Sequence, residues 1–207
     1  MKLAEMTIKD YLDVLKSDAP APGGGSVSAL TAAQGIGLVS MVCELTIGKE
    51  RYKDFEEGCL KAGEEAVKLL AELTEGIDKD TEAFTKVSAA YKMPKSTDEE
   101  KAVRSKAIAE ATLTATEVPF EMLELCLQGL KVTESLVGKS NPNASSDLGV
   151  AALNLLAGIK GAWLNVSINL PSVKDEEAKK KFAAGKEIVA EAETLALKIY
   201  QDVLENL

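Results

Sequence analysis

Apolar positions recur every three or four residues along most of the chain, which is the spacing of an amphipathic helix. The opening stretch TIKDYLDVLK has apolar side chains at Ile8, Tyr11, Leu12 and Leu15, and Thr7 is placed to cap the first turn. No run of alternating polar and apolar residues is long enough to predict a sheet. The pattern therefore predicts an all-α protein that begins with a short amphipathic helix.

Prolines, glycines and capping residues divide the rest of the chain into further helices. These helices are expected at about residues 26–47, 53–91, 97–138, 148–170 and 174 to near the C-terminus. Ser26 and Asp147 are placed to cap the helices that they precede or open. Thr97 and Glu100 have capping-box spacing, and Pro119 predicts a kink or break in the helix that this box begins.

Two of the predicted stretches, residues 26–43 and 148–159, carry no charge. The first contains many small polar residues, and the second is far shorter than the roughly 20 residues that a membrane span needs. We interpret both as buried helices that touch through small residues. With 46% apolar residues in a chain of 207, they predict one helical-bundle domain over residues 1–207. One small bundle covers two such helices poorly, which predicts a homodimer with its site completed across the subunit boundary.

Composition removes several classes of function. The formal net charge of -9 argues against a protein that grips nucleic acid through its phosphates. The chain has no histidine, which excludes histidine-dependent triads and metal sites. Cys43, Cys59 and Cys126 lack metal-ligand spacing, so we expect reduced structural thiols and no bound metal. No secretion signal is recognisable at the N-terminus, and we expect a cytoplasmic protein.

The stretch PAPGGGSVSAL places three consecutive glycines immediately before a predicted helix. A dinucleotide fingerprint needs its glycines between a strand and a helix with the spacing GxGxxG, and neither condition is met. Two interpretations remain. The glycines form a tight turn that lets two helices approach, or free amides at the helix start receive an anionic or carbonyl group.

The stretch IDKDTEAF contains two carboxylates, Asp78 and Asp80, which a helix turns to different faces. Asp80 shares an apolar face with Phe84 and Val87, whereas Asp78 shares a face with Glu82. A carboxylate in apolar surroundings has a raised pKa and is suited to transfer protons. A solvated, charged helix surface is the alternative interpretation.

Two further polar clusters are candidates for ligand binding. The first is NPNASSD, which precedes a nearly charge-free helix, and the local role of its Asp147 is that of a helix cap. The second is the pair Asn165 and Asn169, four residues apart on one face of an apolar helix. Buried amides need hydrogen-bond partners, and either a ligand or loop carbonyls would supply them.

Seven segments together resemble the formiminotransferase-cyclodeaminase family, in order and over nearly the whole chain. The segments are PAPGGGSVSAL, SMVCELTIGKERY, IDKDTEAF, MPKSTDEEKAVR, EVPFEML, SNPNASSDLGVAA and NVSINL. The resemblance implies an all-α homodimer that acts on a tetrahydrofolate one-carbon derivative, without metal or nicotinamide. It also implies hydrolysis of 5,10-methenyltetrahydrofolate to 10-formyltetrahydrofolate. Ring closure of 5-formiminotetrahydrofolate with loss of ammonia, and a non-enzymatic folate-binding or scaffold protein, are the alternatives.

The resemblance also assigns roles to individual residues. Asp80 or its neighbour Asp78 is expected to be the catalytic carboxylate, and Lys49 in the TIGK turn is expected to carry a proton. The residues expected to bind the substrate are Gly24, Gly25, Ser26, Lys95, Arg104, Asn141, Ser146, Asp147 and Asn165. In this assignment the glycines offer backbone amides, Asp147 and Asn165 meet the pterin edge, and the basic residues meet the glutamate tail.

Overall fold

The computed structural model describes residues 2–207, and all regular structure in this part of the chain is helical. The α-helices are α1 (Ile8–Leu15), α2 (Gly24–Glu44), α3 (Glu56–Tyr91), α4 (Asp98–Leu136), α5 (Ser145–Asn169), α6 (Glu176–Ala183) and α7 (Gly185–Leu204). The short 3-10 helices are η1 (Leu3–Glu5), η2 (Glu50–Phe55), η3 (Pro142–Ala144) and η4 (Leu170–Ser172). The prediction of an all-α protein is confirmed.

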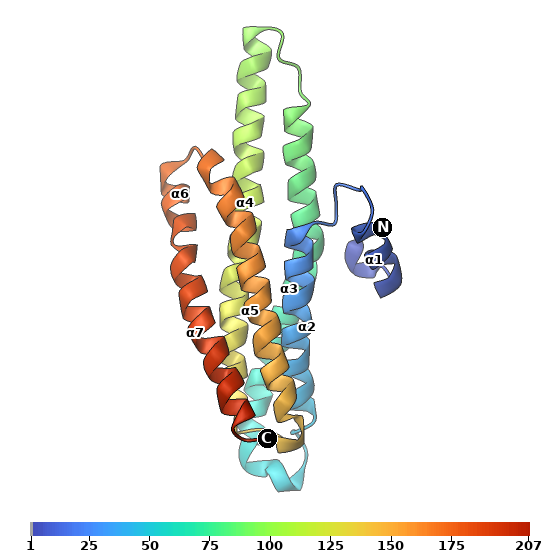
Figure 1. Cartoon of the computed structure of the whole chain (residues 1–207), viewed down its shortest axis with the longest axis vertical. Coiled ribbons are helices and arrows are strands. Elements are labelled where there is room, and N and C mark those ends of the chain that lie inside the picture. Colours follow the sequence, from blue (N-terminus) through green and yellow to red (C-terminus); the bar gives the residue numbers. More distant parts are fainter. Residues whose placement is uncertain (1) are drawn as a thin grey trace.

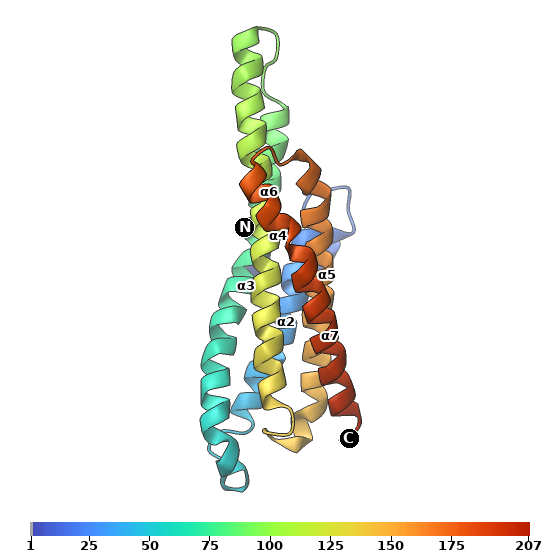
Figure 2. The same ribbon diagram turned by 90° about the vertical axis from the view of Figure 1, so that its left-hand side faces the viewer.

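The long helices lie side by side in an elongated bundle (Figure 1). Helix α2 packs between α3 and α5, and α4 closes the bundle against α3, α5 and α7. Helices α3 and α4 extend beyond the others as a helical hairpin, which Figure 2 shows in green at the top of the molecule. Helix α1 lies beside the bundle, near the start of α2.

Small residues form the contact between α2 and α5. A Cβ atom at Gly158 would lie 2.8 Å from the Cβ atom of Ala32, and one at Gly35 would lie 2.9 Å from the carbonyl oxygen of Ala151. Both distances are shorter than carbon atoms tolerate, so these positions exclude a side chain. The prediction of two buried helices that touch through small residues is confirmed.

By length and composition alone, two helical segments are apolar enough to cross a membrane. They are Gly24–Glu44 and Pro142–Ser172, and 56% and 44% of their most apolar stretches are buried within the bundle. The core helices of a bundle pass the same test, so the composition is only weak evidence for a membrane span.

Several helix ends agree with the sequence. Thr7 accepts a hydrogen bond from the Asp10 amide at the start of α1, and Thr97 and Glu100 form the predicted capping box of α4. Gly138 follows α4 with a φ of 68°, a conformation that favours glycine. Local capping chemistry therefore sets these ends.

The two capping residues expected for the buried helices were wrong. Helix α2 begins at Gly24 with Gly23 as its cap, so Ser26 lies inside the first turn. Helix α5 begins at Ser145, so Asp147 also lies in a first turn. In α2, the Gly23 carbonyl accepts the first helical hydrogen bond, from the amide of Val27 at 3.0 Å. Helix α2 therefore begins within the glycines, before the Ser26 side chain that was expected to cap it.

Two further boundaries differ from the expectation. Helix α4 continues through Pro119, so the break is absent, while the kink stays a prediction. The C-terminal region forms two helices, which meet at Ala184, where one continuous helix was expected. At Gly185 a Cβ atom would lie 2.8 Å from the Trp163 ring, so the break lets α7 begin in close contact with α5.

The three cysteines are free and buried. Burial raises the pKa of Cys43 to about 12, and it also raises the pKa values of Cys59 and Cys126. Thiols that resist ionisation are poor nucleophiles and poor metal ligands. Their structural role agrees with the sequence.

Candidate active site

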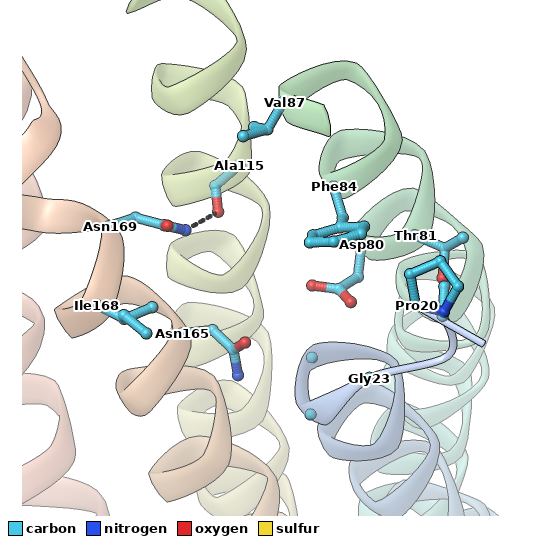
Figure 3. A pocket seen from close by; sticks show the side chains of 13 residues that line it. Pro20, Gly23, Asp80, Thr81, Phe84, Val87, Ala115, Asn165, Ile168 and Asn169 are labelled. Carbon is cyan, nitrogen blue, oxygen red and sulfur yellow. Dashed lines mark hydrogen bonds between the residues drawn. The ribbon is translucent and has the colours of Figure 1, made fainter. Parts of the chain in front are cut away.

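A pocket of about 350 Å³ lies where α2 begins, between α3 and α5 (Figure 3). Its walls include the glycine turn, Asp80 and Phe84 of α3, and Asn165 and Asn169 of α5. Val87 also lines the pocket, so Asp80 shares a face with Phe84 and Val87 as predicted. Asp80 is the only ionisable side chain among the described residues that line this pocket.

The start of α2 holds the Asp80 carboxylate. Asp80 Oδ2 accepts a hydrogen bond from the backbone N–H of Ser26 at 3.0 Å, and the Ser26 hydroxyl lies 3.3 Å from the same oxygen. That hydroxyl also donates to the carbonyl oxygen of Ile77 at 2.8 Å. The positive end of the α2 dipole favours a negative charge at this place. The anionic group that the helix start receives is therefore a carboxylate of the protein itself.

This contact explains one of the three consecutive glycines. A Cβ atom at Gly25 would overlap the carboxylate of Asp80. Only glycine lets the carboxylate reach the helix start. Both interpretations of the glycine stretch are thus partly correct, because a close approach and an anion at free amides occur in one contact.

The environment shifts the proton affinity of Asp80. Burial raises its pKa above the ordinary value, and the hydrogen bonds from Ser26 offset only part of this rise. The carboxylate points into the space between the glycine turn and α5 (Figure 3). A half-buried carboxylate with a raised pKa is suited to act as a base toward a ligand in this space.

The two asparagines stand opposite Asp80, on one face of α5 as predicted (Figure 3). The side-chain amide of Asn165 donates to the carbonyl oxygen of Gly161 at 2.9 Å, and that of Asn169 donates to the carbonyl oxygen of Ala115 at 2.9 Å. Helix carbonyls therefore orient both amides. Gly24 lies against Asn165, since a Cβ atom at Gly24 would be 3.6 Å from its Nδ2 atom.

Ser26 and Asp78 have other partners than the expected substrate. Ser26 is fully buried, and its donors face Asp80 and Ile77, so it positions the carboxylate. Asp78 faces away from the pocket and accepts hydrogen bonds from the backbone N–H groups of Leu3, at 2.6 Å, and Ala4, at 3.3 Å. The prediction that the two carboxylates of the acidic motif face different sides is confirmed.

Four predicted site residues lie at the opposite end of α2 and α5. These residues are Lys49, Asn141, Ser146 and Asp147. The 21 residues of α2 separate this end from Asp80 by roughly 30 Å. Within one subunit, none of the four can therefore act at the same reacting atom as Asp80.

Hydrogen bonds within the protein already engage the Asn141 side chain. Its Nδ2 atom donates to the carbonyl oxygen of Leu45 at 3.1 Å, and its Oδ1 atom accepts from the backbone N–H of Asn143 at 3.1 Å. Its backbone N–H donates to the Thr46 hydroxyl at 3.0 Å. Asn141 thus joins the turn after α2 to the segment before α5.

Lys95 and Arg104 lie on the α3–α4 hairpin. Arg104 donates through Nη2 to the carbonyl oxygen of Tyr91 at 3.1 Å, and its guanidinium carbon is 5.6 Å from the centre of the Tyr91 ring. Lys95 is exposed in the connection between the two helices. Arg104 therefore ties the hairpin together, and neither residue lines the pocket.

The sequence analysis did not identify Thr81 as a residue of the site. Thr81 lines the pocket, and its hydroxyl lies 3.1 Å from the hydroxyl of Ser26. Its position directly after Asp80 was the available signal. Among the described residues, no three His, Cys, Asp or Glu side chains gather closely enough to hold a metal ion.

A family model described as formiminotransferase-cyclodeaminase matches residues 7–187. The chain belongs to the formiminotransferase-cyclodeaminase family. Within this family, it is 42% identical to the methenyltetrahydrofolate cyclohydrolase of Methylorubrum extorquens over 198 residues, which are 95% of each chain. It is 34% identical to the formimidoyltransferase-cyclodeaminase of Rattus norvegicus over 179 residues, which are 86% of this chain and 33% of the rat protein.

The family fold is also seen in a crystal structure of the formiminotetrahydrofolate cyclodeaminase from Thermotoga maritima. That structure matches with a TM-score of 0.82 and 29% sequence identity, and the match covers 100% of this chain and 98% of the other. The family resemblance noted from the sequence segments is confirmed.

Proposed function

We propose that the protein hydrolyses 5,10-methenyltetrahydrofolate to 10-formyltetrahydrofolate. The observation that carries this proposal is the 42% identity, over 95% of both chains, to a methenyltetrahydrofolate cyclohydrolase. The pocket supports it, because a single half-buried carboxylate faces a space lined by amides and apolar groups.

The substrate is an amidinium cation, so its bridging carbon accepts water without help from a metal. Asp80 stabilises the cation and accepts a proton from the attacking water. A carbon–oxygen bond forms, and the bond from this carbon to N5 then breaks as N5 receives a proton. The reaction consumes one water and releases one proton to solvent. We propose that Lys49 carries the proton that N5 receives.

The remaining residues bind the substrate in this proposal. The amides of Gly24 and Gly25 lie in the first turn of α2, where helix geometry leaves N–H groups without intrahelical acceptors. Asn165 and Asp147 offer acceptors to the donor-rich pterin edge. We propose that Lys95 and Arg104, on the hairpin beyond the pocket, meet the anionic glutamate tail.

We further propose that the active enzyme is a homodimer. Outward-facing apolar residues of α2 and α5 form a stripe that we call the α2–α5 face; they include Met41, Val150, Leu153, Leu164 and Ile168. Leu164 and Ile168 are 70% and 77% exposed. Exposure of this kind along two adjacent helices is typical of a surface that another chain covers.

A twofold axis that lies in the plane of the α2–α5 face, perpendicular to its helices, would also explain the division of the predicted site. Such an axis reverses the direction of the partner's α2 and α5, and it pairs the same surface on both subunits. The end that carries Lys49, Ser146 and Asp147 in one subunit would then lie beside Asp80 and Asn165 in the other. We propose that each active site contains residues of both subunits.

An absorbance assay tests the reaction. Purified protein should accelerate loss of the methenyltetrahydrofolate chromophore well above the spontaneous rate. We expect activity to survive dialysis against a metal chelator, since the proposed mechanism uses no metal. A rate equal to the spontaneous rate, with folded protein, would contradict the proposal. Folate binding without turnover would instead favour a non-enzymatic protein.

Formiminotetrahydrofolate cyclodeaminase is the second candidate activity. The observation that favours it is the match to the cyclodeaminase of Thermotoga maritima over the whole chain. Ammonia release from 5-formiminotetrahydrofolate distinguishes it from hydrolysis of the methenyl ring. We expect little ammonia release from a cyclohydrolase, and rapid release would replace the first proposal by the second.

Mixing two inactive variants tests the shared site. Asp80→Asn and Lys49→Met should each abolish turnover as homodimers. After the two are unfolded and refolded together, about a quarter of the wild-type activity should return, because half of the randomly formed dimers contain one intact site of two. Recovery of no activity from mixed dimers, or a fully active monomer in sedimentation, would refute the shared site.

The remaining expectations follow from the same proposal. We expect residues 1–207 to act as one helical domain in a soluble, cytoplasmic enzyme that binds no nucleic acid, membrane or cofactor. Circular dichroism during thermal unfolding should then show one cooperative transition at a fixed protein concentration.

A further inference from the structure

Within residues 2–207, three buried hydroxyl groups have no hydrogen-bond partner: those of Tyr11, Tyr52 and Ser145. Such groups are rare in folded proteins, because removal from water without a partner costs free energy. Tyr52 and Ser145 belong to the end of the bundle that lies far from Asp80. Tyr11 belongs to the end that carries the pocket.

Residues 2–18 lie beside the bundle, and we call them the N-terminal arm. Tyr11 belongs to this arm. It is the only buried residue of α1, whereas its neighbours Ile8 and Leu12 are 80% and 53% exposed. Its ring shares a cavity wall with Ala33 of α2 and Ile77 of α3. Tyr11 is thus the one side chain of α1 that is buried against the bundle, and it ends in a hydroxyl.

The position of Tyr11 relates it to Asp80. Ile77, which lines the Tyr11 cavity, lies one helical turn before Asp80 on the same side of α3. The carbonyl of Ile77 binds the Ser26 hydroxyl, and Ser26 also binds Asp80. Tyr11 therefore lines a cavity that reaches α3 one helical turn before Asp80. Burial, and secondly the charge of Asp80, raise the pKa of the Tyr11 hydroxyl, which keeps it protonated as a donor.

Asp78 fastens the arm in this position. Its carboxylate accepts hydrogen bonds from the backbone N–H groups of Leu3 and Ala4, which ties η1 to α3. The two carboxylates of the acidic motif thus have different tasks. One faces the pocket, and the other holds the segment that carries Tyr11.

We propose that Tyr11 is a positioning residue for Asp80: its hydroxyl donates a hydrogen bond toward the carboxylate through one ordered water and keeps it ionised. The inference rests on the proposed catalytic role of Asp80. Within the described residues of one subunit, no charged side chain lines the pocket beside Asp80 and competes for this task. Helices α2 and α5 present glycines, Ser26 and asparagines to the carboxylate, and Lys79 on α3 is paired with Glu75 at 3.1 Å.

Replacement of one oxygen atom tests the proposal without substrate. Tyr11→Phe keeps the ring and removes the hydroxyl. In a 13C NMR titration of side-chain carboxyls, with the Asp80 signal assigned through Asp80→Asn, the apparent pKa of Asp80 should rise by about half a unit or more. Tyr200→Phe is the control, because it removes the same atom from a tyrosine on α7, which does not line the pocket, and it should leave this titration unchanged. An unchanged Asp80 titration in Tyr11→Phe would overturn the proposal.

The kinetic effect separates a positioning role from a packing role. With methenyltetrahydrofolate, Tyr11→Phe should lower kcat about tenfold with little change in KM, and should move the acidic limb of the pH profile upward. Its thermal stability should change little, because the ring and its packing are kept. Tyr200→Phe on α7 should leave turnover unchanged. Loss of activity in parallel with loss of stability would indicate packing and overturn the proposal.

The arm provides an independent check. Asp78→Ala releases η1 and should shift the Asp80 titration in the same direction, and adding Tyr11→Phe should then cause no further shift. Additive shifts would refute the link through the arm. Because these titrations need no substrate, an unshifted Asp80 in an active enzyme refutes only this inference. A shifted Asp80 in a protein without folate turnover refutes only the proposed function.

Discussion

At one end of the α2–α5 pair a carboxylate and two amides face a pocket, whereas at the other end the side chain of Asn141 joins two segments of the protein. Asp80 is held from behind by Ser26 and leaves its other side toward the pocket. Asn141 has the same small polar character, yet its amide joins Leu45 to Asn143. Residue type alone does not identify a site; the side chain must also face a pocket, as Asp80, Asn165 and Asn169 do.

The largest expected effect concerns the pocket end. Asp80→Asn preserves the shape of the side chain but removes the base, so turnover should fall by about a hundredfold or more with the fold retained. Chromophore loss and circular dichroism measure the two properties. Asp78→Asn is the matched control, since it faces the N-terminal arm, and it should reduce turnover far less than Asp80→Asn does. Equal effects of the two substitutions would remove the distinction between these carboxylates.

A smaller but still large effect is expected from the glycine that admits Asp80. Gly25→Ala should displace the carboxylate, lower turnover more than about tenfold and reduce stability by about 1–3 kcal/mol through overpacking. Gly58→Ala is the control: no atom lies near its added methyl group, and alanine favours a helix, so stability should rise slightly. Denaturant unfolding and the absorbance assay compare the two variants. Normal activity in Gly25→Ala would contradict the close approach.

At the far end, we expect an effect on stability. Asn141→Ala removes the bond to the Leu45 carbonyl and leaves the Asn143 amide without its acceptor, which should cost about 1 kcal/mol or more. Denaturant unfolding at one protein concentration measures the loss. Asn143→Ala is a suitable comparison, because the bond at this residue is made by its backbone and survives the substitution. An unchanged stability in Asn141→Ala would show that this end is not held as described.

The smallest effect is the dependence of stability on pH. Burial raises the pKa of Asp80 in the folded protein, so the folded state binds its proton more tightly than the unfolded chain does. The contribution of Asp80 to stability is therefore present below the ordinary aspartate pKa and is lost as the pH rises through its folded pKa. The midpoint of thermal unfolding for Asp80→Asn, relative to wild type, should be more favourable at pH 7 than at pH 3. A difference that does not change with pH would contradict the raised pKa.

Most of the fold was predictable because its signals are local. Helical periodicity and the capping box at Thr97 located the long helices, and small residues indicated the contact of α2 with α5. The start of α2 was misplaced because tertiary contacts decide it. Ser26 has the chemistry of a helix cap, but its hydroxyl instead binds the Ile77 carbonyl on another helix.

The candidate site was predicted less completely. The spacing in the acidic motif separated Asp80 from Asp78, and the spacing of Asn165 and Asn169 placed both on one face. Periodicity carries no information about distance along the bundle. It therefore did not show that Lys49 and Asp147 lie a helix length away from Asp80, nor that Tyr11 enters from a separate arm. The roles of these residues remain predictions.

The absence of a side chain at Gly25 also limits the mutations that its codon tolerates. Every amino acid reached from a glycine codon by one nucleotide change has a Cβ atom, and at Gly25 that atom would strike the Asp80 carboxylate. At Gly23, two codons earlier, no atom lies within 4 Å of an added Cβ, and the backbone is extended with a φ of -122°. A saturation library selected for folded protein should therefore accept many residues at the first of the three glycine codons and almost none at the third.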